Sequence, residues 1–182
     1  KIENIEAEAA KLIARGNIIG WFQGRMEWGP RALGNRSLIT DPRDIKIKDI
    51  LNLRIKKRES FRPFAPSVLE EDSREWFNIP KCNSISKQFM LFAFKAKKDK
   101  TRKIPAVIHI DGTSRIQEVS KKTNPKYHKL ITEFKKITGI PLILNTSFNE
   151  NEPIVCNPQD AINTFTRTKM NYLVIGNYIC KK

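Results

Sequence analysis

Apolar residues recur along the chain at two spacings, one typical of helices and one typical of strands. Four segments have the helical spacing: residues 3–15, 45–56, 125–138 and 158–167. Gly16 and Gly139 directly follow two of these segments, and a glycine at this position commonly ends a helix in the left-handed conformation. The pattern therefore predicts several amphipathic helices that end at defined residues.

Short apolar runs between these helices predict strands at residues 17–23, 37–40, 89–94, 106–110, 115–119, 140–144 and 172–175. The run 140–144 is apolar throughout, which is typical of a strand buried on both faces. The runs 106–110 and 115–119 flank Asp111-Gly112, a hairpin signal. Because helices and strands alternate without an internal repeat, we expect one α/β domain.

Charge is the most unusual property of the composition. The 182 residues include 34 Lys and Arg against 19 Asp and Glu, a formal net charge of +15. Such an excess indicates an anionic partner, which can be nucleic acid, an acidic surface or a phosphorylated small molecule. The lysine runs at 95–103 and 121–126 are typical of solvated faces, so charge alone does not select among these partners.

Cysteine and histidine placement predicts no metal site and no disulfide framework. Cys82, Cys156 and Cys180 are far apart and lack C-x-x-C spacing, and His109 and His128 form no cluster with them. No apolar run approaches the roughly 18 residues that a membrane-spanning helix needs. These features favour a protein of the reducing cytoplasm that does not enter the membrane.

A loop rich in glycine and arginine follows the first predicted strand, at residues 29–37. Gly29 and Gly34 have the spacing of a P-loop, but Asn35 and Arg36 stand where that motif needs Lys and Ser or Thr. Its guanidinium and amide groups, with Arg31 foremost, can still donate hydrogen bonds to an anion. A purely structural turn is the alternative.

A second basic loop, residues 56–66, contains two prolines and two phenylalanines that stiffen its backbone. Arg62 would then be presented with little conformational freedom and could grip a phosphate through two parallel hydrogen bonds. Lys56 would add a point charge. We predict that Arg62→Ala weakens a phosphate-bearing ligand by about 2 kcal/mol, unless the loop is only a surface cluster of ion pairs around Glu59.

Two further polar clusters stand at the ends of predicted strands. Arg115 comes just after the tight turn at Asp111-Gly112, and Asn145, Ser147 and Asn149 follow the buried run 140–144. Ligands of open α/β sheets bind at the carboxyl ends of strands, so these side chains are candidates for ligand contacts. A hairpin with an incidental arginine and an Asx-turn are the structural alternatives.

Together these segments supply a set of cations and amides but no nucleophile. Neither a Ser-His-Asp set nor a Cys-His pair is evident, so covalent catalysis is not indicated. A cationic pocket suits phosphate chemistry, in which positioning and charge neutralisation contribute most. The candidate ligand-binding residues are Arg31, Arg36, Lys56, Arg62, Arg115, Asn145, Ser147 and Asn149.

Four motifs resemble those of one enzyme family: residues 24–37, 57–67, 111–115 and 144–149, with residues 152–155 adding to the match. In this order they are similar to the C-terminal half of the NodU/CmcH/TobZ carbamoyltransferases, over residues 20–182. The resemblance implies a YrdC-like domain with a twisted, largely open mixed sheet flanked by helices. It places this domain at residues 17–182, with residues 1–16 as a helix joining it to an upstream domain.

The family resemblance implies a carbamoyltransferase that converts carbamoyl phosphate and ATP to carbamoyl-adenylate, with Mg²⁺ arriving on the nucleotide. Transfer to a hydroxyl of a sugar or other metabolite belongs to an N-terminal actin-like domain, which this chain lacks. Because the chain begins at Lys1 and enters a helix almost at once, we expect a piece of a longer polypeptide.

The motif positions also imply roles for single residues. Lys56, Arg62 and Arg115 match catalytic positions, although Lys57 could replace Lys56. The positions that match contacts to carbamoyl phosphate or ATP are Arg31, Lys56, Arg62, Arg115, Asn145, Ser147 and Asn149. Two alternatives remain: a threonylcarbamoyl-adenylate synthase of the same fold, and a basic RNA-binding module, which the net charge motivates.

Overall fold

A mixed β-sheet organises the chain in the computed structural model, which describes residues 2–81 and 85–182; Cys82 lies outside them. Within these residues the sheet has seven strands in the order β6-β3-β7-β2-β1-β8-β9. The strands are β1 (Ile19–Phe22), β2 (Arg36–Thr40), β3 (Ala65–Leu69), β6 (Gln117–Val119), β7 (Leu142–Ser147), β8 (Tyr172–Ile175) and β9 (Tyr178–Lys181). The predicted α/β class with an open mixed sheet is confirmed.

Strand directions bring three chain segments to one end of this sheet. β7 runs antiparallel to both β2 and β3, while β3 and β6 run parallel. Ser147 therefore lies opposite Ser37, and Asn145 lies opposite both Ile39 and Ala65. The carboxyl end of β7 consequently meets the starts of β2, β3 and β6. Predicted site residues from distant motifs are gathered at this end.

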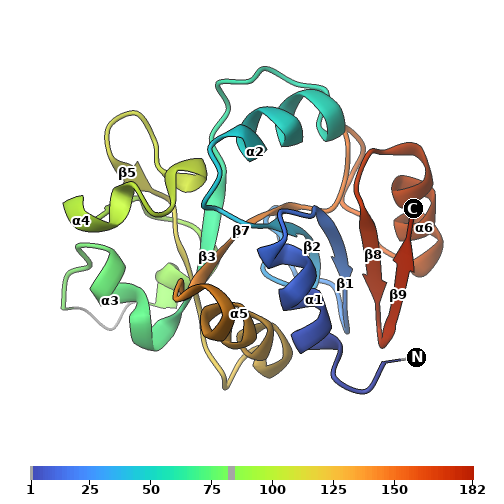
Figure 1. The fold of residues 1–182 in the computed structure, drawn as a ribbon, viewed down its shortest axis with the longest axis horizontal. Helices are drawn as coiled ribbons and strands as arrows, with labels where there is room; N and C mark the ends of the chain where they lie inside the picture. The colour runs from blue at the N-terminus through green and yellow to red at the C-terminus, as the bar shows by residue number, and fades with distance from the viewer. Residues whose placement is uncertain (1, 82–84) are drawn as a thin grey trace.

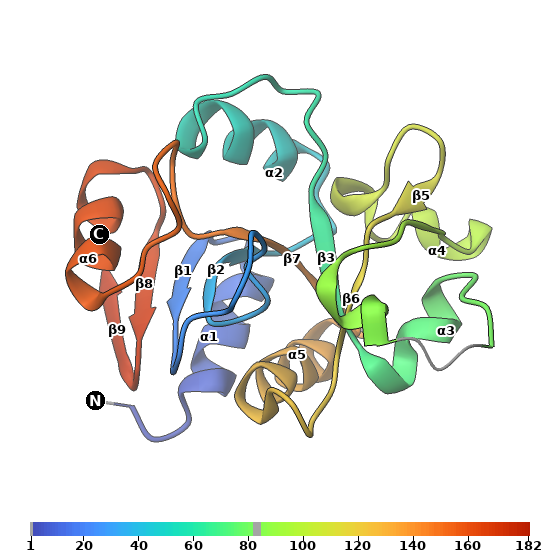
Figure 2. The same ribbon diagram turned by 180° about the vertical axis from the view of Figure 1, so that it is seen from behind.

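Helices α1 (Ile5–Ala14) and α5 (Pro125–Thr138) pack side by side on one face of the sheet, as Figures 1 and 2 show from opposite sides. Asn124 caps α5 by accepting a hydrogen bond from the backbone of Tyr127, and Gly139 ends it at φ 73°. Helix α6 (Pro158–Arg167) begins with a capping box between Asn157 and Asp160 and packs on β8 and β1. These helices agree with the predicted ranges.

The core lies between the sheet and the pair α1 and α5. Ile13, Trp21, Ile39, Phe134 and Ile143 are among its fully buried side chains. They come from α1, β1, β2, α5 and β7, so both helices contribute to the same apolar layer. No helix of the described part is long and apolar enough to cross a membrane.

The remaining elements are short. Helix α2 (Lys46–Asp49) continues into a π-helical turn (Ile50–Ile55), as predicted for residues 45–56. The others are α3 (Ser73–Trp76), α4 (Lys98–Thr101), three 3₁₀ helices (Glu70–Asp72, Ile85–Phe89, Pro105–Val107) and a second small sheet of β4 (Phe94–Lys95) and β5 (Thr113–Ser114).

Three strand predictions need correction. Residues 89–94 and 106–110 do not form the predicted strands, and β6 pairs with β3 instead of closing a hairpin on residues 106–110. Pro105 has no N–H to donate and begins a 3₁₀ turn there. The sequence analysis did not predict the strand β3, because Pro66 lies within it and prolines are typical of loops. That proline lies before Ser67, the first β3 residue paired with β6, so its missing N–H costs no bond to β6.

Candidate functional site

A pocket of about 110 Å³ lies at the end of the sheet where β7 stops and β2, β3 and β6 begin. Three arginines line it, and none of the described residues that line it is Asp or Glu. The pocket is therefore cationic and suited to a small anion. Its lining residues are Pro30, Arg31, Ala32, Arg58, Pro63, Phe64, Ala65, Met90, Arg115, Asn145, Thr146 and Ser147.

The glycine-arginine loop forms one wall of this pocket, and hydrogen bonds to Glu27 hold the backbone of the loop in place. Glu27 Oε1 accepts hydrogen bonds from the backbone nitrogens of Leu33 and Asn35 at 2.8 and 2.6 Å. Gly34 has φ 109°, and a Cβ there would lie 2.2 Å from the ring of Tyr127. The second glycine is thus required both by its backbone conformation and by a close contact with α5.

Arg31 and Arg115 face the same pocket from different segments. Arg31 is exposed, whereas Arg115 is partly buried and its Nε has no hydrogen-bond partner. Burial lowers the pKa of Arg115, and the neighbouring charge of Arg31 lowers it further. Two unneutralised guanidinium groups so close together are a favourable arrangement for binding an anion.

Arg58 is the third arginine of the pocket, and the sequence analysis did not single it out. Its Nε donates to Asn52 Oδ1 at 2.7 Å, and its guanidinium lies 5.0 Å from the ring centre of Phe64. Burial lowers the pKa of Arg58, with the charge of Arg62 as the second cause. Its position in the basic run beside Lys56 was the available signal, and the phenylalanine that orients it was not foreseeable.

Asn145 lies at the floor of the pocket and is 1% exposed. Its Nδ2 lies 2.9 Å from the carbonyl oxygen of Ala32, 2.9 Å from Ser67 Oγ and 3.1 Å from Gln117 Oε1. Its Oδ1 is buried and has no partner. The amide nitrogen is thus held by three protein acceptors, while the amide oxygen is buried without a hydrogen-bond partner.

Lys56 is buried beside the pocket and ties the segment after β7 in place. Its Nζ donates to the carbonyl oxygens of Ser147 (2.6 Å) and Asn149 (2.8 Å) and to Asn149 Oδ1 (2.6 Å). Burial lowers the pKa of Lys56 to about 7, with the charge of Arg58 second and Glu152 opposing. Lys57 instead pairs with Glu150 at 2.5 Å and is mostly exposed, so Lys56 is the inward lysine.

Ser147 and Asn149 play different parts in this segment. Ser147 lines the pocket, and its hydroxyl donates to Asn149 Oδ1 at 2.8 Å. Asn149 does not line the pocket, and its Nδ2 donates to the carbonyl oxygen of Glu152 at 2.6 Å. Asn149 therefore shapes the loop that carries Ser147.

Arg62 and Arg36 lie apart from the pocket lining. The Arg62 side chain is 51% exposed and pairs with Glu59 at 2.8 Å, the arrangement expected of a surface ion pair. Arg36 is buried, and its guanidinium lies 3.6 Å from the ring centre of Phe22. Arg36 donates hydrogen bonds to the backbone carbonyls of Gln23, Gly24, Asn35 and Cys156.

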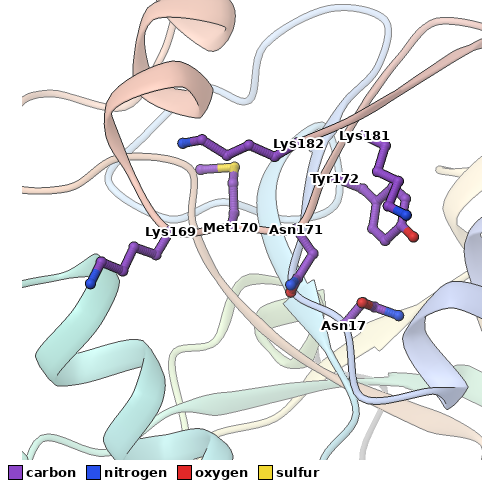
Figure 3. Close-up of a pocket in the computed structure, with 7 residues that line it drawn as sticks. All are labelled: Asn17, Lys169, Met170, Asn171, Tyr172, Lys181 and Lys182. Carbon is purple, nitrogen blue, oxygen red and sulfur yellow. The ribbon is translucent and has the colours of Figure 1, made fainter.

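A larger pocket of about 330 Å³ lies at the other side of the sheet, near the start of β8 and the end of β9. Figure 3 shows that the side chains of Lys169, Lys181 and Lys182 point in different directions there. Lys182 Nζ already donates to the carbonyl oxygens of Phe165 and Thr166. None of the predicted site residues contributes, so the smaller arginine pocket is the better candidate.

Among residues 2–81 and 85–182, no group of three or more His, Cys, Asp or Glu side chains could hold a metal ion.

Residues 10–182 match the family model described as "Carbamoyltransferase C-terminus". The chain belongs to this family. It is 50% identical over 181 residues to nodulation protein NolO of Bradyrhizobium diazoefficiens. The aligned region comprises 99% of this chain and 33% of that protein. The chain thus spans about a third of the length of this relative.

Solved structures of low sequence identity share the fold of this carbamoyltransferase C-terminal domain. Sua5 of P. abyssi, solved with L-threonine, superposes with a TM-score of 0.65 at 15% identity over 97% of this chain and 48% of that one. Full-length HypF in its phosphate- and nucleotide-bound form superposes with a TM-score of 0.62 at 18% identity, over 94% of this chain and 25% of that one. The predicted YrdC-like fold is confirmed.

Proposed function

We propose that this domain binds carbamoyl phosphate and ATP and forms carbamoyl-adenylate, for transfer to a hydroxyl of a sugar or other metabolite. The observation that carries the proposal is the pocket with Arg31, Arg58 and Arg115 and no acidic residue in its described lining. Membership in the carbamoyltransferase C-terminus family supports a carbamoyl group as the group that is transferred. The bound phosphate and nucleotide of HypF support phosphate chemistry on this fold.

The pocket is large enough to enclose only the smaller of the two proposed substrates. Its volume of about 110 Å³ is below the roughly 300–1,000 Å³ of pockets that enclose drug-sized ligands. Carbamoyl phosphate is small enough to be enclosed, whereas ATP extends over the neighbouring surface. We assign the nucleotide phosphates there to Arg62, which lies outside the lining but close enough to lower the pKa of Arg58.

The reaction balances with one water. Carbamoyl phosphate loses phosphate to water, and a carbamate oxygen then bonds to the α-phosphorus of ATP as pyrophosphate leaves. The three arginines neutralise charge on the phosphate groups, while Lys56 holds Ser147 at the pocket edge. Because the described lining offers no carboxylate for Mg²⁺, we assign that ion to the nucleotide.

The rest of the proposal concerns the whole protein. Transfer of the carbamoyl group to its acceptor is assigned to an actin-like domain upstream of α1, with residues 1–16 at the junction. The cytoplasm is the compartment we assign to the whole protein. Helix α1 packs against α5 in the described part, so this junction would lie against the domain.

Pyrophosphate release tests the proposal on the chain of residues 1–182. We expect release that requires Mg·ATP and carbamoyl phosphate together. Threonine with bicarbonate and ATP serves as the comparison, because Sua5 was solved with L-threonine. Equal release with threonine would favour the threonine reaction, and no release with carbamoyl phosphate would contradict the proposed activity.

A further inference from the structure

Asn52 is a fully buried polar residue that lies outside the lining of the arginine pocket. Its Nδ2 donates to the carbonyl oxygens of Ser60 (3.1 Å) and Arg62 (3.0 Å), and its Oδ1 accepts from Arg58 Nε at 2.7 Å. Both polar atoms of this side chain are therefore committed to the loop of residues 56–66.

The two ends of the Asn52 amide cannot be exchanged. Nδ2 faces two carbonyl oxygens, which can only accept hydrogen bonds, and Oδ1 faces Arg58 Nε, which can only donate one. A turned amide would oppose oxygen to oxygen at one end and nitrogen to nitrogen at the other, at a buried position where unpaired polar atoms are costly. Asn52 therefore presents an acceptor to Arg58 in one fixed orientation.

The local backbone brings Asn52 and Arg58 together. The π-helical turn (Ile50–Ile55) carries Asn52, and turns of this kind are rare and frequently found at functional sites. Lys57 follows at φ 45°, in the left-handed region that is uncommon for a residue other than glycine. Just after it, the backbone nitrogen of Arg58 donates to the carbonyl oxygen of Asn52 at 3.0 Å. Arg58 is thus joined to Asn52 through the main chain as well as the side chain.

The Arg58 guanidinium is held at one end and open at the other. Within the part of the chain that the structure describes, Nε is its only nitrogen with a hydrogen-bond partner, and the ring centre of Phe64 lies 5.0 Å from its carbon. Arg58 is half-buried and lines the pocket. The two terminal nitrogens therefore remain available as a fixed pair of donors, which is the geometry that suits a phosphate.

We propose that Asn52 is a positioning residue that aims the guanidinium of Arg58 at the phosphate of carbamoyl phosphate. This inference rests on the proposed function, in which Arg58 neutralises charge on the phosphate, and it gives a role to a residue that does not touch the ligand. Holding Arg58 before the ligand arrives reduces the conformational entropy that its side chain loses on binding. The bonds to Ser60 and Arg62 fix the loop, and the bond to Nε fixes the direction of Arg58.

A double-mutant cycle separates this positioning from a purely structural role. In calorimetric titrations with carbamoyl phosphate, Asn52→Ala should raise the Kd about 3- to 10-fold in the unaltered chain, because Arg58 is no longer held. In an Arg58→Ala background the same change should alter the Kd by less than about 1.5-fold, since no guanidinium is left to aim. An Arg31→Ala background is the matched control, in which the full rise should persist. Equal rises in all three backgrounds would overturn the inference.

Arg58→Lys tests the same arrangement without a change at Asn52. One ammonium group cannot bond Asn52 Oδ1 and also present a fixed pair of donors, so this variant should bind carbamoyl phosphate nearly as weakly as Arg58→Ala. A Kd within about twofold of the unaltered chain would overturn the inference, and this result decides if Asn52→Ala does not fold. If the unaltered chain does not bind carbamoyl phosphate, the proposed function and the inference both fail. If it binds and Asn52→Ala leaves the Kd unchanged, only the inference fails.

Discussion

Basic side chains of the same motifs occupy two contrasting environments in this domain. Arg36 and Lys56, here called the anchored cations, are buried and use their donors on protein oxygens. Arg31 and Arg115, the open cations, line a pocket, and Arg115 leaves a buried donor unused. The anchored cations hold backbone segments together, whereas the open cations are available for a ligand.

The contrast teaches that the number of protein acceptors around a cation separates a structural from a ligand-binding role better than motif membership does. Arg31 and Arg36 stand five positions apart in one motif, Arg31 in the loop and Arg36 at the start of β2. Only the fold shows that one guanidinium reaches four backbone carbonyls and the other reaches a pocket.

Loss of an anchored cation should have the largest effect. Arg36→Ala leaves the buried carbonyl of Gln23 and the carbonyl of Gly24, among others, without their donor. We expect the free energy of unfolding to fall by about 3–5 kcal/mol, because several charge-assisted bonds are lost together. Urea unfolding followed by circular dichroism measures it. A loss below about 1 kcal/mol would remove the distinction between the two groups.

The two glycines of the arginine loop offer a matched pair. Gly29 and Gly34 have φ values of 116° and 109°, but only at Gly34 would a Cβ meet a neighbour, the ring of Tyr127. Gly29→Ala should cost about 1–2 kcal/mol from backbone strain alone. Gly34→Ala should cost about 1–3 kcal/mol more from the contact with α5. Equal costs in urea unfolding would show that the loop is not held against α5.

Loss of an open cation should affect binding and spare the fold. Arg115→Ala removes a buried donor that has no protein partner, so the free energy of unfolding should change by less than about 1 kcal/mol. Affinity for carbamoyl phosphate should fall by about 1.5–3 kcal/mol. Calorimetry and urea unfolding on the same preparation check both. Destabilisation like that of Arg36→Ala, with unchanged binding, would reverse the assignment.

The pH dependence of stability tests the environment of Lys56. Its pKa is about 7 in the folded state against an ordinary value of 10.5, so the unfolded chain binds more protons at this residue between these values. Its contribution to stability should therefore rise as pH increases from about 7 towards 10. The difference in unfolding free energy between the unaltered chain and Lys56→Met isolates it. A difference that stays flat with pH would contradict the shift.

Arg62 should give the smallest effect. Its exposed ion pair with Glu59 and its position outside the pocket lining lower the effect expected from its motif. Arg62→Ala should raise the Kd for carbamoyl phosphate by no more than about threefold at physiological salt, because exposed charges are screened. A loss as large as that of Arg115→Ala would place Arg62 in the site and require a different pocket boundary.

The sequence predicts the long amphipathic elements well and the short ones poorly. Helices α5 and α6 match because a proline, a capping asparagine and apolar spacing agree at each. The runs 89–94 and 106–110 failed because short apolar runs do not distinguish a strand from a 3₁₀ turn. Leu91 and Phe92, inside the first run, are exposed instead of buried in a sheet.

The candidate site divides in the same way. Motifs indicated Arg31, Arg115, Asn145 and Ser147, which the sheet brings together because strand ends meet there. They included Arg58 without singling it out, because its orientation depends on Phe64 and Asn52. They also could not show that one amide oxygen stays unpaired, because this depends on side chains from four separate segments.

A crystal structure of the domain with carbamoyl phosphate tests the central claim most directly. We expect the ligand in the arginine pocket, with its phosphate beside the guanidinium groups of Arg31, Arg58 and Arg115. Ligand density in the larger pocket of Figure 3, beside Asn17 and Asn171, with the arginine pocket empty, would contradict the account.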